Sequence, residues 1–340
     1  MKRATRRIFF LLLLLFIAGN AYAQELRFFE PGDFRLENGQ IIKECKLGYR
    51  TFGTLAPDKS NAILFPSWFA GTSQELIDLG IIGPGKIVDT SRFYVIAVDS
   101  IGNGVSSSPS NSKVQPGASF PEFTIRDMVA IEHLLLTHEL HLEHLHAVAG
   151  ISMGGMQAFE WMVTHPGFFK KAVLIVGSPR PAVSDLLQCR AEVLAIRAGS
   201  CGNIVLGMQA VAAMHTAALR TPQYIDAHTA PNEFPQFLEK MEKNFSRFDP
   251  NDWEWQLKAI MGHNIYRNFD GSPERAAAAV KTKTLIVYNR QDRMVSPEPS
   301  LHFAGAIGAQ TVEIPSDCGH AVFLCEKDKL REVVGTFLAK

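Results

Sequence analysis

The sequence predicts an α/β fold built on a mostly parallel, doubly wound sheet. Short apolar runs that are typical of buried strands alternate along the chain with segments whose apolar residues recur at helical spacing. Polar, glycine-containing loops follow several of these runs, and the carboxyl ends of parallel strands are where such sheets carry their sites. With 340 residues, of which 46% are hydrophobic, the chain can bury a sizeable core.

The predicted elements follow one another as a doubly wound sheet requires. Helical spacing over residues 124–140, 155–165 and 327–338 predicts covering helices. The predicted strands comprise residues 49–52, 62–65, 93–98, 145–149, 171–177, 284–288 and 311–314.

This alternation stops over residues 181–280. The stretch has no strand pattern, is helical in character and is rich in Met, Ala, Trp and Phe. An insertion of this kind between two core strands predicts a helical lid, because lids exclude water and shape a pocket. Most of its apolar residues are expected to pack the insertion's own small core. The lid would interrupt a core made of residues 24–180 and 281–340.

Residues 1–23 have the pattern of an export signal. Basic residues precede the apolar run of residues 8–18, and the Ala-Tyr-Ala at residues 21–23 fits a small-x-small cleavage site. The basic segment is also similar to a twin-arginine signal. The apolar run is shorter than the roughly 20 residues that span a bilayer, which weighs against an uncleaved anchor. We expect a periplasmic or secreted protein without a stable membrane anchor, whose mature chain begins near Gln24.

The five cysteines leave their pairing open. Export would bring them into an oxidising compartment, where Cys189 and Cys201 are one candidate pair. Because the number is odd, at least one thiol stays free or pairs between chains.

The segment Gly150-Ile151-Ser152-Met153-Gly154 has the Gly-x-Ser-x-Gly pattern of a nucleophile elbow. It stands between a predicted strand and a predicted helix, which is the context that the motif requires. In such a turn the serine backbone is strained so that its oxygen projects above the sheet, and a side chain two residues either way would collide with it. We therefore predict that Ser152 is a nucleophile.

A serine nucleophile needs a histidine to take its proton and a carboxylate to orient that histidine. In this fold class the acid and then the histidine follow the serine along the chain. Asp292 lies just beyond a late apolar strand, and His320 lies in the loop after the last one. We predict these residues as acid and base. The alternatives are a helix-capping role for Asp292, Asp317 as the carboxylate, and a solvated loop position for His320.

Catalysis by such a nucleophile also needs two backbone N–H groups that point at the substrate's carbonyl oxygen, which becomes negative when the serine attacks. One belongs to the residue after the serine, Met153. We predict that the other belongs to Phe69, in the loop that follows an early strand. Ordinary packing at a pocket wall is the alternative for the Phe69 side chain, and both roles can hold at once.

Other ligands have weaker support. The 34 basic and 34 acidic residues balance, so there is no basic field for nucleic acid. A cluster of His138, His141, Glu143, His144 and His146 departs by one residue from the His-Glu-x-x-His zinc pattern and is better explained by an exposed helical face. We expect no metal and no cofactor.

The chain resembles the homoserine O-acetyltransferase family of α/β-hydrolase proteins over most of its predicted mature length. The resemblance implies an α/β-hydrolase fold with Ser152, Asp292 and His320 as nucleophile, acid and base, a helical lid, and often a dimer joined through that lid. The matching stretches are residues 47–55, 123–129, 150–158, 247–249 and 319–320.

Departures from that family favour hydrolysis. Ala321 follows the histidine where the family's acetyltransferases carry an aspartate, and residues 67–71 replace their His-Ala-Leu-Thr-Gly. Acetyl-CoA is cytosolic, whereas water is available to an exported enzyme. The expected function is therefore an exported serine hydrolase that cleaves a carboxylic ester or related acyl compound through an acyl-enzyme. An O-acyltransferase of the homoserine O-acetyltransferase type and a non-catalytic binding protein are the alternatives.

Overall fold

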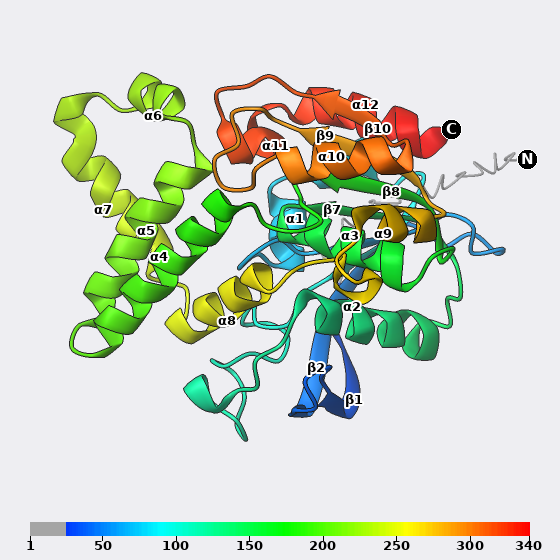
Figure 1. Ribbon diagram of the computed structural model, residues 1–340, viewed down its shortest axis with the longest axis horizontal. Helices are drawn as coiled ribbons and strands as arrows, with labels where there is room; N and C mark the ends of the chain where they lie inside the picture. Colours follow the sequence, from blue (N-terminus) through cyan, green and yellow to red (C-terminus); the bar gives the residue numbers. More distant parts are fainter. Residues whose placement is uncertain (1–24) are drawn as a thin grey trace, which may run out of the picture.

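The main sheet runs through the centre of the molecule (Figure 1), whose computed structural model describes residues 25–340. The predicted export signal of residues 1–23 lies outside this range. Eight strands have the order β1-β2-β6-β3-β7-β8-β9-β10. The β1–β2 and β2–β6 pairs are antiparallel and all other neighbours are parallel, which confirms the predicted α/β fold. The strands are β1 (Arg27–Arg35), β2 (Ile41–Phe52), β3 (Ala62–Pro66), β6 (Tyr94–Val98), β7 (Leu145–Ile151), β8 (Phe169–Ile175), β9 (Lys283–Tyr288) and β10 (Gln310–Glu313).

Helices cover both faces of this sheet. Because successive strand residues point to opposite faces, the fully buried β3 divides its side chains between two cores. Leu64 packs in the core that contains Phe159 of α3, whereas Ile63 packs in the core that contains Leu330 of α12. The first core lies under α2 (Ile125–Leu134), α3 (Met153–Thr164) and α10 (Glu298–Ile307), and the second under α1 (Ser73–Asp78) and α12 (Lys327–Ala339).

The sequence patterns do not predict β1, the first part of β2, or the small sheet of β4 (Ile82–Gly83) and β5 (Val88–Asp89). In β1 only Phe29 and Phe34 are buried, and they are an odd number of residues apart. Both reach the core because the register with β2 shifts on either side of Gly32. Such bulges break the period of two on which strand prediction depends.

Between β8 and β9 the chain is helical, with α4 (Val183–Ser200), α5 (Ile204–Leu219), α6 (Pro222–His228), α7 (Phe234–Phe245), α8 (Pro250–Met261) and α9 (Pro273–Ala279). Helices α4 to α7 project to one side of the sheet (Figure 1). The last helix, α9, instead packs against α3 and α10 of the core. Within residues 25–340, no helix is long and apolar enough to cross a membrane.

The cysteine pairing differs from the candidate pair considered above. Cys318 and Cys325 form a disulfide with their Cα atoms 6.5 Å apart, while Cys189 and Cys201 are free. Cys189 lies within α4 and Cys201 directly follows it, so a rise of 1.5 Å per residue separates them by about 18 Å. A disulfide requires Cα atoms closer than about 7 Å, which excludes the earlier pair.

A buried carboxyl group lies between α2 and α3. Glu132 has no exposed surface, and its Oε2 accepts a hydrogen bond of 2.7 Å from the Trp161 indole. Burial raises the pKa of Glu132 to about 8, from an ordinary value of 4.5. Between about pH 4.5 and pH 8, Glu132 is therefore protonated in the folded chain and ionised in the unfolded chain.

This shift makes stability dependent on pH. Because the folded pKa is raised, the stability from the retained proton is fully present below about pH 4.5 and is lost as the pH rises toward 8. The substitution Glu132→Gln keeps the acceptor for Trp161 and removes the titration. We expect its unfolding free energy, relative to the native protein, to increase between pH 6 and pH 9 in urea titrations. Glu143→Gln, at an exposed position, is the control, and a Glu132→Gln difference that is the same at both pH values would contradict the assignment.

Candidate active site

Ser152 occupies a sharp turn between β7 and α3. Its φ of 56° and ψ of −121° are strained for a residue with a side chain. Its N–H donates to the carbonyl of Ile175 in β8, at 2.9 Å. A Cβ atom at Gly150 would lie 2.2 Å from the carbonyl oxygen of Gly154, and one at Gly154 would lie 2.6 Å from that of Pro66. The two glycines are therefore required by the close approach of backbone to backbone.

The structure brings together the three side chains that the sequence analysis singled out. Nε2 of His320 lies 2.8 Å from Oγ of Ser152, and Nδ1 of His320 lies 2.7 Å from Oδ2 of Asp292. All three residues are buried. A carboxylate beside Nδ1 favours the tautomer with the proton on Nδ1, which leaves the Nε2 lone pair to accept from the serine hydroxyl.

The carboxylate of Asp292 is itself held in place. Its Oδ1 accepts hydrogen bonds from the N–H groups of Met294 and Val295, each at 2.9 Å. Oδ2 is thus left for His320. Asp317, the alternative carboxylate, contributes its backbone oxygen to a hydrogen bond from Thr221, so Asp292 is the acid that contacts the imidazole.

Asn289 joins the two loops that carry the acid and the histidine, and the sequence analysis missed it. Its side chain is 1% exposed, and Nδ2 donates to the carbonyls of Ile314 and Ser316 at 3.1 and 2.7 Å. Oδ1 accepts from the N–H of Gln291. A polar residue directly after the apolar run of β9 was the signal available in the sequence.

The loop that carries His320 is also tied to α11 (Val322–Cys325) and to the insertion. The Cys318–Cys325 disulfide spans the histidine. Gly319 has a φ of 60°, and a Cβ there would lie 3.3 Å from the backbone nitrogen of Thr221, between α5 and α6. Little space therefore separates the insertion from the histidine loop.

The two backbone amides that the sequence analysis predicts for the oxyanion are those of Met153 and Phe69. Met153 is the first residue of α3, where the N–H groups lack helical partners and the helix dipole favours negative charge. Within residues 25–340, no hydrogen bond from the amide of Met153 or Phe69 is found. The Phe69 ring packs edge-on against Trp253 with centroids 4.6 Å apart. Its side chain therefore packs while its backbone N–H stays unpaired, so both roles considered for Phe69 are compatible with the structure.

A further buried carboxylate borders the Asp292 loop. Asp185, in the first turn of α4, accepts hydrogen bonds from the N–H groups of Ser296 and Ala182 at 3.1 and 2.9 Å. Burial raises the pKa of Asp185, and the nearby charge of Asp292 adds to the effect in the same direction. This side chain fixes the start of α4 to the loop that orients the acid.

The histidine cluster at residues 138–146 does not gather into a site. His138, His141, Glu143 and His144 are exposed, and Nε2 of His146 contacts the carbonyl of Leu338 at 2.9 Å. Within residues 25–340, no three His, Cys, Asp or Glu residues are grouped as metal ligands require.

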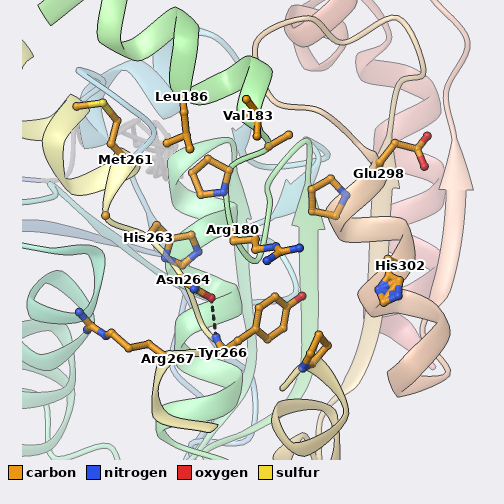
Figure 2. A pocket seen from close by; sticks show the side chains of 15 residues that line it. Arg180, Val183, Leu186, Met261, His263, Asn264, Tyr266, Arg267, Glu298 and His302 are labelled. Atoms are coloured by element: carbon orange, nitrogen blue, oxygen red, sulfur yellow. Dashed lines mark hydrogen bonds between the residues drawn. The ribbon is translucent and has the colours of Figure 1, made fainter. Parts of the chain in front are cut away.

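One cavity lies where the insertion joins the core. It has a volume of about 800 Å³ and none of the five predicted site residues lines it. Figure 2 shows Arg180 and His263 on the segments that connect insertion and core, with Glu298 and His302 on α10. Burial lowers the pKa of His263 to about 3, so its ring is neutral, and Nε2 lies 3.1 Å from the carbonyl of Ser178. The two connections are thus tied to each other.

Comparison with known proteins agrees with this architecture. The sequence profile of the alpha/beta hydrolase fold family matches residues 85–326. An ethyl acetate hydrolase from Pseudomonas veronii is 32% identical over 79% of this chain and 81% of its own length. A homoserine O-acetyltransferase from Methanohalophilus mahii is 29% identical over 90% of this chain and 70% of its own.

Solved structures give the same result. The acetyl esterase MekB superposes with a TM-score of 0.85 at 28% identity, over 93% of this chain and 96% of its own. The chain is therefore an enzyme of the α/β hydrolase fold family, in the branch that contains esterases and homoserine O-acyltransferases.

Proposed function

We propose that this protein hydrolyses carboxylic esters through Ser152, His320 and Asp292. The observation that carries the proposal is the continuous hydrogen-bond chain from the serine hydroxyl through the imidazole to the carboxylate. Serine is a weak nucleophile until a base takes its proton, and this arrangement supplies that base.

In the proposed reaction, Oγ of Ser152 attacks the ester carbonyl carbon while Nε2 of His320 takes the hydroxyl proton. The ester C–O bond then breaks, and Nε2 returns the proton to the departing alkoxide, which leaves as the alcohol. A water molecule repeats these steps on the acyl-enzyme. It gives one proton to His320, which passes it back to Ser152 as the carboxylic acid departs. Asp292 stabilises the imidazolium formed in each half-reaction.

The N–H groups of Met153 and Phe69 are proposed to bind the oxygen that becomes negative in each tetrahedral intermediate. Two features support this role: neither amide has another acceptor among the residues that the structure describes, and one opens a helix next to the nucleophile. Donors that are fixed before the reaction stabilise developing charge without reorganising.

We propose acetyl and other short acyl esters as the substrates. The support comes from two relatives, an ethyl acetate hydrolase and an acetyl esterase, that match most of this chain. Ala321 after the histidine favours an uncharged substrate over homoserine, because it offers no carboxylate for an ammonium group.

Acyl transfer to an alcohol is the second candidate, since several relatives at 27–30% identity are homoserine O-acetyltransferases. Both reactions pass through the same acyl-enzyme and differ only in whether water or an alcohol removes the acyl group. The proposed export favours water, because acetyl-CoA is confined to the cytosol.

Export and cleavage after residue 23 remain our proposal. The Cys318–Cys325 disulfide supports it, because disulfides persist in oxidising compartments and are rare in the cytosol.

The first test is a panel of acyl esters, assayed beside acetyl-CoA with homoserine. We expect hydrolysis of acetyl esters and labelling of the native protein by a fluorophosphonate, because this reagent reacts with activated serines. Ser152→Ala should lose labelling and lower kcat by at least about 10⁴-fold. Undiminished labelling of this variant, or product formation only when homoserine is present, would refute serine ester hydrolysis.

The second test separates Asp292 from Asp317. In Asp292→Asn the Oδ1 atom can still accept from Met294 and Val295, but the amide NH2 then faces Nδ1 of His320. This favours the wrong tautomer, with the proton on Nε2 facing the serine. We expect kcat for ester hydrolysis to fall by about 10³–10⁴-fold with little loss of thermal stability. Asp317→Asn is the matched control and should retain activity within a few-fold.

The third test addresses export. Full-length protein is expressed in a Gram-negative bacterium. It should be recovered from the periplasm or medium, and its intact mass should be that of a chain beginning at Gln24. That mass should be about 2 Da below the fully reduced value, because one disulfide removes two hydrogens. Recovery of uncleaved chain from the cytosol or the membrane fraction would overturn the proposal.

A further inference from the structure

A single side chain from the insertion holds two loops beside the nucleophile. Gln256, on α8, has no exposed surface. Its Oε1 accepts a hydrogen bond of 2.7 Å from the N–H of Ala70, and its Nε2 donates one of 2.9 Å to the carbonyl of Ile101. The first partner lies in the loop after β3 and the second in the loop after β6, so this amide ties both loops to α8.

The loop after β3 needs such support. Ala70 directly follows Phe69, and its φ of 54° lies in the left-handed region that residues with a Cβ rarely adopt. Backbone strain of this kind persists only where the surroundings fix it. The next residue, Gly71, is held through its carbonyl by Asn103 Nδ2 at 3.0 Å. Gln256 and Asn103 therefore fix the peptide units that follow the amide of Phe69, and that amide has no acceptor in the described part of the chain.

Helix α8 also contacts the side chain of Phe69. Trp253, one turn before Gln256, packs edge-on against the Phe69 ring. The Trp253 indole donates to Oε2 of the buried Glu192 at 2.8 Å, and His215 contacts the same carboxylate while its ring stacks on Phe69. The helices of the insertion thus contact both the backbone and the side chain of this segment.

Helix α8 is firmly attached to the core. The carboxylate of Asp252 at its start accepts from the N–H of Ser110 at 2.8 Å. Lys258 contacts Glu122 at 2.8 Å. Just beyond its end, His263 reaches the connection to α4, where Figure 2 shows its ring at the cavity wall. A helix held at both ends can carry a side chain that fixes another loop.

We propose that Gln256 is a positioning residue for the oxyanion hole, and that the insertion thereby completes the hole as well as covering the site. This inference rests on the proposed serine mechanism. The hole works only if its N–H groups point at the position of the oxyanion, and small displacements of a donor lose much of its effect. A neutral glutamine can bind the Ala70 amide without placing a negative charge near the developing oxyanion.

The test compares Gln256→Met with the native protein. Methionine has a similar length and cannot form either hydrogen bond. We expect kcat for an acetyl ester to fall by roughly 10- to 50-fold, less than for complete loss of a donor, while KM changes less than about twofold. The inhibition constant of propylboronic acid, whose serine adduct places an oxygen in the hole, should rise by the same factor as kcat falls.

The matched control is Trp255→Phe on the same helix. Its indole donates to the carbonyls of Phe120 and Pro121, near the start of α2, rather than to Ala70 or Ile101, so kcat and boronate affinity should stay within about twofold. If Gln256→Met does not fold, Gln256→Asn, which keeps the amide but shortens its reach, should show the same paired changes.

Unchanged kcat in Gln256→Met, a lower kcat with unchanged boronate affinity, or an equal loss in Trp255→Phe would each overturn the positioning role. Failure of the proposed function is distinguishable, because the native protein would then show neither ester hydrolysis nor serine labelling. If the native protein transfers acyl groups instead, the same comparison applies to that reaction, since it uses the same hole.

Discussion

The left-handed backbone of Ser152 is the constraint on which the site depends. A residue with this φ and ψ needs backbone atoms packed closely around it, and the missing side chains at Gly150 and Gly154 allow that packing. The hydrogen bond from the Ser152 amide to β8 then fixes the turn to the centre of the sheet. As a result the hydroxyl stands at the carboxyl ends of the parallel strands, where the loops after β9 and β10 can reach it.

His320 and Asp292 are positioned by contacts with residues that take no part in the proposed reaction. The imidazole of His320 is held between Ser152 and Asp292 by three features of its loop. The loop is closed by a disulfide, contacted by the insertion, and linked by Asn289 to the loop of Asp292. Asp292 is oriented by two backbone amides that occupy its other oxygen. Loops that are individually short and polar thus become rigid through one another, which is what preorganised chemistry requires.

The sequence predicts the parts of this protein that local patterns encode. Buried parallel strands are continuous apolar runs, and the elbow motif has a fixed spacing, so the sheet and the positions of Ser152, Asp292 and His320 could be predicted. The edge strand β1 could not, because a bulge at Gly32 breaks its periodicity. Cysteine spacing could not predict the disulfide, because the approach of Cys318 to Cys325 depends on the fold of the loop around His320. Gln256 contacts a residue 186 positions away, and no local pattern carries that information.

The two chain segments that connect the insertion to the core meet each other at Ser178 and His263. Because the two ends of the insertion lie next to each other, a different segment could join the same two ends without disturbing the sheet. In this molecule such a replacement would also remove Gln256, which accepts a hydrogen bond from the amide of Ala70. The insertion is therefore joined to the core at its two ends and also, through Gln256, at the loop that follows β3.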